Sequence, residues 1–203
     1  MGRRSDHTRE ELRKLILDAA NRIIHADGFD NLTARHLANE VGYTPGTIYN
    51  IFTSMDDLYL EINGVTLDRL YEVLSSTECS NPKKTPLQNM KKMASLYMDF
   101  CQQNRAHWLM LFSPKLPEGR ERQEWYQKKI DRLFLPLEQL MAPLFSTREN
   151  DRRRMAARLL WSSIHGLCFL QQTGKIPIVS GRSRPLEMAE YLIETFVRGI
   201  EKT

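Results

Sequence analysis

The stretch "VGYTPGTIYNIF", residues 41–52, limits what this chain can fold into more than any other segment. Gly42 predicts the end of one short helix, because glycine readily takes the left-handed conformation found just past helix ends. Thr44 suits the N-cap of the next helix, and Pro45 its first position, where the missing N–H costs nothing. The stretch therefore predicts a tight turn between two short helices, which we expect at residues 33–41 and 44–52.

Two short helices joined in this way form the helix-turn-helix arrangement, whose second helix presents its first residues to base edges in the DNA major groove. Ile48 and Phe52 lie four residues apart and are predicted to anchor that helix against the first. Thr44, Thr47, Tyr49 and Asn50 are left facing outward, and threonine and asparagine can both bond to bases. Gly46 would let the backbone approach a phosphate. Two short helices with a glycine turn also occur in many folds that bind no DNA.

Helical spacing of apolar residues continues through the rest of the chain. Residues 12–24 carry apolar side chains at i, i+3, i+4, i+7 and i+8, as one face of an amphipathic helix does. Thr8 with Glu11, and Ser54 with Asp57, have the spacing of capping boxes. No convincing strand alternation occurs. We predict an all-α fold of about nine helices, the others lying near residues 8–27, 54–74, 86–104, 105–112, 121–146, 149–173 and 185–201.

The order of residues in "LTARHLANEVGYTPGTIYNIFTSMDDL" resembles the N-terminal domain of the TetR (tetracycline repressor) family of transcriptional regulators. The resemblance covers about residues 8–62 and rests on Thr33, Ala38, Gly42, Gly46, Tyr49 and Phe52. It implies a helix-turn-helix DNA-binding domain, taken as residues 1–55, followed by a helical ligand-sensing and dimerisation domain, residues 56–203. Pattern and resemblance together predict DNA contacts from Arg3, Arg4, Thr33, Arg35, Thr44, Pro45, Gly46, Thr47, Tyr49 and Asn50.

Two positions depart from the family pattern. Asn50-Ile51 replaces the aromatic-His or His-Tyr pair that commonly precedes the phenylalanine, and Met55 stands where members commonly carry a phosphate-binding lysine. Residues 1–57 hold seven Lys and Arg against nine Asp and Glu. We therefore expect DNA binding with a shallow salt dependence, because few phosphates would be neutralised. Arg3 and Arg4 would compensate by entering the adjacent minor groove, unless they belong to a solvated tail.

Composition excludes several other classes of protein. The net charge of +4 mildly favours an anionic partner. The three cysteines form no CxxC pair, and we expect neither a metal nor another cofactor. No P-loop, GxGxxG or HExxH motif is present, so the chain is not expected to be an enzyme. The absence of a secretory signal and of a long apolar run predicts a cytoplasmic protein without membrane contact.

The region from residue 86 to 145 is rich in methionine and aromatic residues, which suit either an adaptable ligand pocket or an ordinary core. In residues 149–173, a Trp-x-x-x-His-Gly pattern resembles one subgroup of TetR-type C-terminal domains. His165 in it is either a hydrogen-bonded core histidine or a ligand contact. The residues predicted to line a pocket are Met93, Tyr97, Trp108, Phe112, Trp125, Trp161 and His165.

The last two predicted helices each carry a repeating apolar face. Two such helices from each chain would form a four-helix interface in a homodimer, although either face would equally suit the core of one chain. The predicted interface residues are Leu160, Ile164, Leu167, Ala189, Ile193, Phe196 and Ile200.

The sequence thus predicts a homodimeric repressor that binds an inverted-repeat operator in double-stranded DNA and is released by a small apolar or amphipathic effector. The alternative is a helical ligand-binding or interaction protein that has lost specific DNA binding, an option kept open by Met55 and the acidic balance of residues 1–57.

Overall fold

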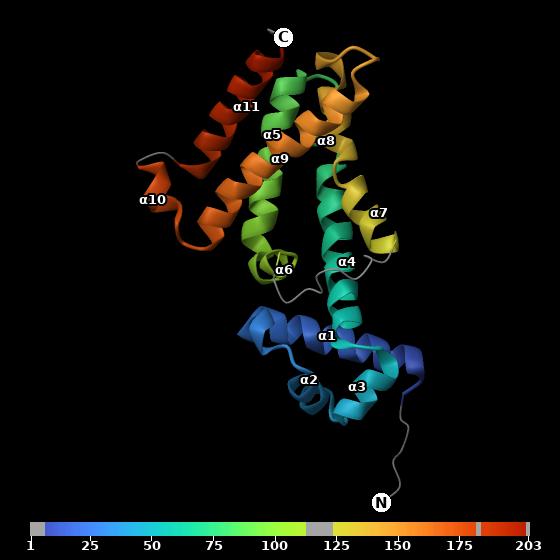
Figure 1. Ribbon diagram of the computed structural model, residues 1–203. Coiled ribbons are helices and arrows are strands. Elements are labelled where there is room, and N and C mark those ends of the chain that lie inside the picture. Colours follow the sequence, from blue (N-terminus) through green and yellow to red (C-terminus); the bar gives the residue numbers. More distant parts are fainter. Residues whose placement is uncertain (1–6, 113–123, 182–183, 202–203) are drawn as a thin grey trace, which may run out of the picture. The chain divides into compact units, whose positions relative to one another are not determined.

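The computed structural model describes residues 7–112, 124–181 and 184–201 of the 203-residue chain. In that part the chain forms eleven α-helices and two short 3-10 helices, and no strand (Figure 1). The all-α class predicted from the sequence is confirmed. Among the described residues, no helix combines the length and the apolar character that crossing a membrane requires.

The chain divides into two compact units. One consists of residues 1–66 and 106–122, and the other of residues 67–105 and 123–203; only the described residues of each are considered below. The first unit extends past the predicted boundary at residue 55, because helix α4, Met55–Leu74, carries Leu58 and Ile62 into the N-terminal core. Helix α6, Arg105–Met110, also contributes Met110 to that core.

The N-terminal unit is built on three helices and the start of α4. Helices α1 (Arg9–Asp27), α2 (Ala34–Val41) and α3 (Pro45–Ile51) contact one another pairwise, and the 3-10 helix η1 (Phe29–Asn31) links the first two. Figure 1 shows α1 lying across α2 and α3. The apolar face predicted for residues 12–24 forms the centre of this core, where Ile16, Ala19 and Ile24 are fully buried.

Local capping sets where these helices begin. The predicted capping box of α1 is present, with the Glu11 N–H donating to Thr8 Oγ1 at 3.2 Å and the Thr8 N–H donating to Glu11 Oε2 at 2.7 Å. Thr33 caps α2 by accepting from the His36 N–H at 3.2 Å. Before α4, Ser54 Oγ accepts from the Asp57 N–H at 3.2 Å.

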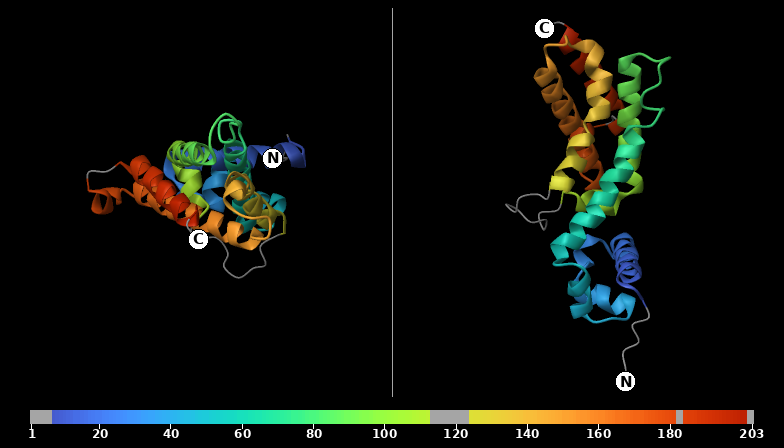
Figure 2. Two further views of the ribbon diagram at one scale, coloured as in Figure 1. Left: turned by 90° about the horizontal axis from the view of Figure 1, so that it is seen from above. Right: turned by 90° about the vertical axis from the view of Figure 1, so that its right-hand side faces the viewer.

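In the C-terminal unit, helix α5 (Pro86–Gln103) packs against three other helices. These are α8 (Leu135–Met141), α9 (Asn150–Gln172) and α11 (Pro185–Glu201). The remaining elements are α7 (Glu124–Arg132), the 3-10 helix η2 (Ala142–Leu144) and α10 (Ile176–Ser180). Helix α11 runs beside α9, with α10 at the bend between them, as Figure 1 and the left view of Figure 2 show.

The structure corrects two features of the predicted helix list. The single helix expected over residues 121–146 is broken into α7, α8 and η2, because Pro136 and Pro143 each remove a backbone N–H that a continuous helix would need. The segment between the last two long helices contains the short helix α10, where only a loop was expected. Residues 121–123, the start of the expected helix, lie outside the described part.

Candidate nucleic-acid interface

The turn between α2 and α3 is set by Gly42. Its backbone lies in the left-handed region, at φ 74° and ψ 26°. The Tyr43 N–H donates to the Ala38 carbonyl at 2.9 Å and the Gly42 N–H donates to the Asn39 carbonyl at 3.2 Å. These two bonds form a Schellman motif, which satisfies the carbonyls at the end of α2 and reverses the chain within two residues. The predicted glycine turn is therefore present.

Helix α3 begins where the sequence predicted, but its cap differs in detail. Thr44 has the extended backbone of an N-cap residue and Pro45 occupies the first position. The Thr44 hydroxyl makes no cap hydrogen bond to the backbone; it lies 3.1 Å from the Thr47 hydroxyl. The expectation that the Thr44 side chain caps the helix is therefore wrong, because Thr47 one turn later offers its hydroxyl a competing partner.

The inner face of α3 is held by the two predicted anchors. Ile48 and Phe52 are both buried in the N-terminal core together with Leu37 of α2. The Arg13 guanidinium of α1 stacks on the Phe52 ring, 4.9 Å from its centroid. These contacts fix the rotation of α3 about its axis, so that the residues between the anchors must face outward.

The predicted DNA-contact residues of α3 form one outward surface. Thr44, Pro45, Gly46 and Asn50 are exposed, Tyr49 is 49% exposed, and Thr47 is half-buried. Thr33 and Arg35 at the start of α2 are exposed too. Arg3 and Arg4 lie outside the described residues.

Gly46 is not required by the packing of the chain itself. A Cβ atom at this position would meet only Thr44 Oγ1, at 3.8 Å, which is ordinary van der Waals contact. Its backbone is helical, so no positive φ calls for glycine. A glycine early in an exposed helix costs about 1 kcal/mol relative to alanine. Neither the packing nor the backbone of the chain itself therefore accounts for the glycine at this position.

Tyr43 and His7 form a contact that the sequence did not predict. His7 Nδ1 lies 2.9 Å from the Tyr43 hydroxyl, and the two rings meet edge to face at 6.2 Å. This contact places His7, two residues before α1, beside the turn that precedes α3. Both residues are polar and accessible at this surface, but 36 positions separate them, so no local pattern could have paired them.

Acidic side chains outnumber basic ones in the described N-terminal residues, since residues 7–57 hold five Lys and Arg against eight Asp and Glu. The cations Arg22 and Arg13 are paired with Glu40 and Glu61. Arg35, at the exposed start of α2, has no carboxylate partner among the described residues, so its guanidinium could bind a phosphate at this surface. Met55 begins α4 and supplies no charge.

Both parts of the chain match known families. Residues 16–62 match the sequence model described as "Bacterial regulatory proteins, tetR family". Residues 90–196 match the model described as "Tetracyclin repressor-like, C-terminal domain", which alone covers more than half of the 203 residues. The chain belongs to the TetR family. It is accordingly a DNA-binding transcriptional regulator and not an enzyme, as predicted. No curated protein matches the chain.

Several solved structures share the fold of this TetR-family chain. A protein of unknown function from Rhodococcus sp. RHA1 aligns with a TM-score of 0.72 at 17% identity, covering 98% of each chain. A TetR-like transcriptional regulator from the same organism aligns with a TM-score of 0.60 at 19% identity, covering 97% of this chain and 100% of that chain. The fatty acid degradation regulator FadR from Bacillus halodurans aligns with a TM-score of 0.62 at 14% identity, covering 91% of this chain and 94% of that chain. At these identities the likeness concerns the fold.

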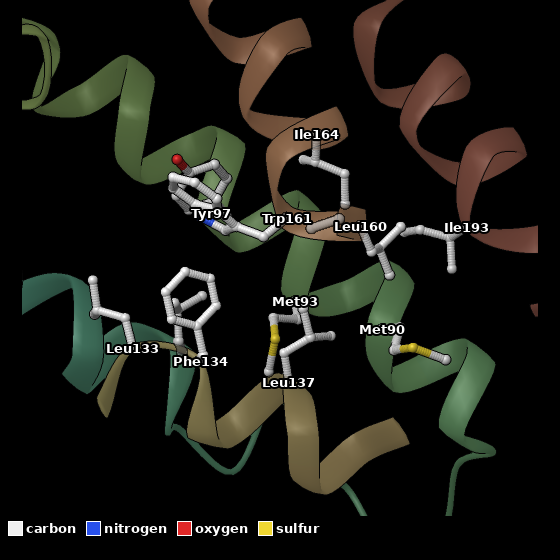
Figure 3. Close-up of a pocket in the computed structure, with 12 residues that line it drawn as sticks. Met90, Met93, Tyr97, Leu133, Phe134, Leu137, Leu160, Trp161, Ile164 and Ile193 are labelled. Atoms are coloured by element: carbon white, nitrogen blue, oxygen red, sulfur yellow. The ribbon is translucent and has the colours of Figure 1, made fainter. Parts of the chain in front are cut away.

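The C-terminal unit of this TetR-family protein contains an apolar cavity (Figure 3). Its empty volume is about 460 Å³, including space open to solvent. Three residues predicted to line a pocket, Met93, Tyr97 and Trp161, do line it. The other lining residues are Leu74, Met90, Ala94, Leu133, Phe134, Leu137, Leu160, Ile164 and Ile193.

The remaining predicted pocket residues lie elsewhere. Trp108 is fully buried and Phe112 packs against it at 5.3 Å, and both belong to the N-terminal unit. Trp125 on α7 is partly exposed and contacts Tyr126. These three were grouped with the pocket on composition alone, which does not say which aromatic residues share a core.

His165 does not line the cavity itself, but it contacts two residues that do. Its ring stacks on Trp161 at 4.8 Å, and its Nδ1 lies 2.9 Å from the Tyr97 hydroxyl. Burial lowers the pKa of His165 to about 4, so the imidazole is uncharged at neutral pH. Because its Nδ1 hydrogen-bonds to the hydroxyl of the lining residue Tyr97, His165 helps to fix the position of the cavity lining.

Most residues predicted for a dimer interface are buried within one chain. Leu160, Ile164, Ala189 and Ile193 are almost completely inaccessible, and the first two and Ile193 line the cavity. Leu167, Phe196 and Ile200 are half-buried. The repeating faces therefore lie largely in the core of the C-terminal unit, the alternative that the spacing had left open.

Other apolar side chains of α9 to α11 are exposed. On α9, Met155 is 67% and Leu159 58% exposed, and Phe169 follows on the same side of the helix at i+14 from Met155. On α10, Ile178 is 81% exposed, and on α11, Tyr191 is 72% exposed. We call Met155, Leu159 and Phe169 the outer face of α9.

Proposed function

We propose that this TetR-family regulator is a homodimeric repressor that binds an inverted-repeat operator through α3 and leaves it when a small ligand occupies the cavity. The observation that carries the proposal is the outward surface of α3, with Gly46 at its centre. A protein that acts on chromosomal DNA works in the cytoplasm, which we include in the proposal.

The surface of α3 suits base contact. Its two anchors fix its rotation, and the exposed Tyr49 and Asn50 and half-buried Thr47 occupy the first two turns, the part of a recognition helix that reaches the groove. Thr47 lies one turn in and is the first choice for a base contact, while the family resemblance favours Tyr49 for phosphate. Arg35, already predicted to contact DNA, is assigned here to phosphate, and Tyr43 is added as a further phosphate contact.

Dimerisation is supported by the outer face of α9. A run of large apolar side chains this exposed is unusual on a monomer and marks a surface that another molecule covers. Ser162 and Gly166 lie between the large residues on the same side, so a second helix could approach closely. We therefore propose that the dimer forms through this outer face, with Tyr191 of α11, in place of the buried faces first predicted.

Ligand control is supported by the cavity. Five helices or their flanking turns supply its lining, and Met90 and Met93 can adapt to a bound molecule. A ligand that releases the operator must favour the non-binding conformation, through a coupling of about 1–3 kcal/mol in typical cases.

The competing proposal is a ligand-binding or interaction protein of the same fold that no longer binds specific DNA. Met55 in place of the usual lysine and the acidic balance of residues 1–57 favour it. The two proposals differ in one property, sequence-specific binding to the DNA beside the protein's own gene.

A binding titration with that DNA separates the two. The purified protein should bind the flanking DNA at least about 10³-fold more tightly than unrelated DNA of equal length, as specific regulators do. Gly46→Ala should weaken specific binding while leaving the thermal midpoint of unfolding unchanged or raised, because the chain has room for the added methyl group. Equal affinity for both DNAs would reject the repressor and leave the competing proposal.

A further inference from the structure

The hydroxyl group of Thr47, the third residue of α3, already has a partner within the chain. Its oxygen lies 3.1 Å from the hydroxyl oxygen of Thr44. Thr44 stands at the N-cap position but makes no side-chain cap hydrogen bond, so its hydroxyl is directed to Thr47 instead. The two threonine hydroxyls thus bond to one another at the surface that is proposed to face DNA.

This pairing limits what the Thr47 hydroxyl gains from a base. A hydroxyl has a single proton to donate, and inside a helix the carbonyl oxygens three and four residues earlier compete for it as well. Turning the hydroxyl of Thr47 toward a base breaks its bond with Thr44. A hydrogen bond from Thr47 to a base therefore replaces one that the free protein already makes, and the net gain is small.

The methyl group of Thr47 has no such bond to lose. The hydroxyl and the γ-methyl group are the two branches on Cβ, and the hydroxyl branch is the one held by Thr44. Removing a methyl group from water is favourable when an apolar group covers it. Thymine carries such a group in the major groove, its C5 methyl, and a threonine methyl is among the groups that contact it. The chemistry of Thr47 in this fold therefore favours apolar contact with thymine.

The residues just before Thr47 favour the same kind of contact. Pro45 and Gly46 are exposed and carry no polar side-chain group. An atom added as Cβ at Gly46 would lie 3.8 Å from Thr44 Oγ1, beside the pair of hydroxyls, and glycine leaves that place open. Apart from the two paired hydroxyls, no side chain from Thr44 to Thr47 offers a hydrogen-bonding group to a base.

We propose that Thr47 determines specificity for thymine by placing its γ-methyl group against the C5 methyl of one thymine in each half of the operator, while Thr44 holds its hydroxyl. Thr47 is the residue that contacts the base, and Thr44 is a positioning residue. The inference rests on the proposed function, because it requires α3 to lie in the major groove. It adds the identity of the base and the apolar nature of the contact.

The first test changes only the DNA and uses the wild-type protein. Each thymine of the operator is replaced in turn by deoxyuridine, which pairs with adenine in the same way and lacks only the C5 methyl group. One position in each half-site should lose about fourfold in affinity per site, the effect of burying about one methyl group. Unchanged affinity at every thymine would overturn the proposal.

Two variants assign the contact to Thr47. Thr47→Val keeps a γ-methyl group and removes the hydroxyl, so it should still prefer thymine to deoxyuridine at that position. Thr47→Ser keeps the hydroxyl and removes the methyl group, so it should bind both DNAs equally. Thr53→Ser, at an exposed threonine in the turn after α3, is the matched control and should leave the preference unchanged. A preference that survives in Thr47→Ser, or is lost in Thr47→Val, would overturn the proposal.

Failure of this inference differs from failure of the proposed function. A protein that binds its operator specifically and accepts deoxyuridine at every position retains the repressor function, and Thr47 does not read a thymine methyl group. A protein that binds flanking and unrelated DNA equally loses the repressor function, and this inference is rejected with it. If a Thr47 variant does not fold, the deoxyuridine series with the wild type still decides whether a thymine methyl group is read.

Discussion

Single residues decide the geometry of the proposed DNA surface. Gly42 supplies the left-handed backbone that reverses the chain, and Pro45 starts the next helix at once. Gly46 then leaves one position in the first turn of that helix without a side chain. These effects are local, because each depends on the residue's own backbone, and they were predicted from the sequence for that reason. The hydrogen bond of the Thr44 hydroxyl was not predicted, because the rotamer of Thr44 decides whether this hydroxyl bonds to the backbone or to Thr47.

His165 is predicted to make the protein less stable in mild acid. Its pKa in the folded chain is about 4, below the usual 6.5, because it is buried. The unfolded chain therefore binds the proton first, and the stability contributed by the neutral imidazole is fully present above pH 6.5 and lost as the pH falls toward 4. Denaturant midpoints at pH 7.5 and 5.0 should differ more for the wild type than for His165→Gln.

Carboxylates also begin to titrate near pH 5.0, so the effect of His165 is read from the difference between the wild type and His165→Gln. Identical pH dependence in wild type and His165→Gln would show that His165 takes up its proton equally well in the folded protein. In that case its ring would be better hydrated than its contacts with Trp161 and Tyr97 indicate.

At the scale of elements, the sequence predicted which residues share a face, but not what covers that face. The spacing of Leu160 and Ile164 on α9 was correct, yet the face lies inside the chain and lines the cavity. Periodicity is the same whether a helix packs on its own chain or on a second one. The break between α7 and α8 shows a similar limit, since the apolar spacing continued across Pro136 while the backbone hydrogen bonds did not.

The outer face of α9 leads to a prediction about oligomeric state. Leu159→Glu should dissociate the dimer at micromolar concentration, because its carboxylate would lie unpaired in a desolvated interface. Sedimentation velocity measures this directly. Leu135→Glu is the matched control, since Leu135 of α8 is a leucine of similar exposure, 48% against 58%, on another helix. A wild-type monomer, or dissociation by Leu135→Glu alone, would contradict the proposed face.

On the scale of the whole molecule, the chain combines two units with different chemistry. The N-terminal unit presents a short helix with exposed polar residues, and the C-terminal unit encloses an apolar cavity. Membership of the TetR family joins the two in one regulator. The sequence identified the first unit by its residue order. Apart from Met93, Tyr97 and Trp161, the cavity residues had to be found in the structure, because they come from helices far apart in the chain.

Helix α3 is the element proposed to read DNA, and a binding series over single-base variants of the operator at two salt concentrations tests this role most directly. Base contacts discriminate between bases by about 1–3 kcal/mol each, whereas phosphate contacts contribute affinity and salt dependence. Thr47→Ala should relax the preference at one base pair of each half-site. Tyr49→Phe should weaken all variants about equally. If Thr47→Ala weakens every variant equally while Tyr49→Phe relaxes one base pair, the two roles are reversed. If neither substitution changes operator binding, α3 does not read the DNA.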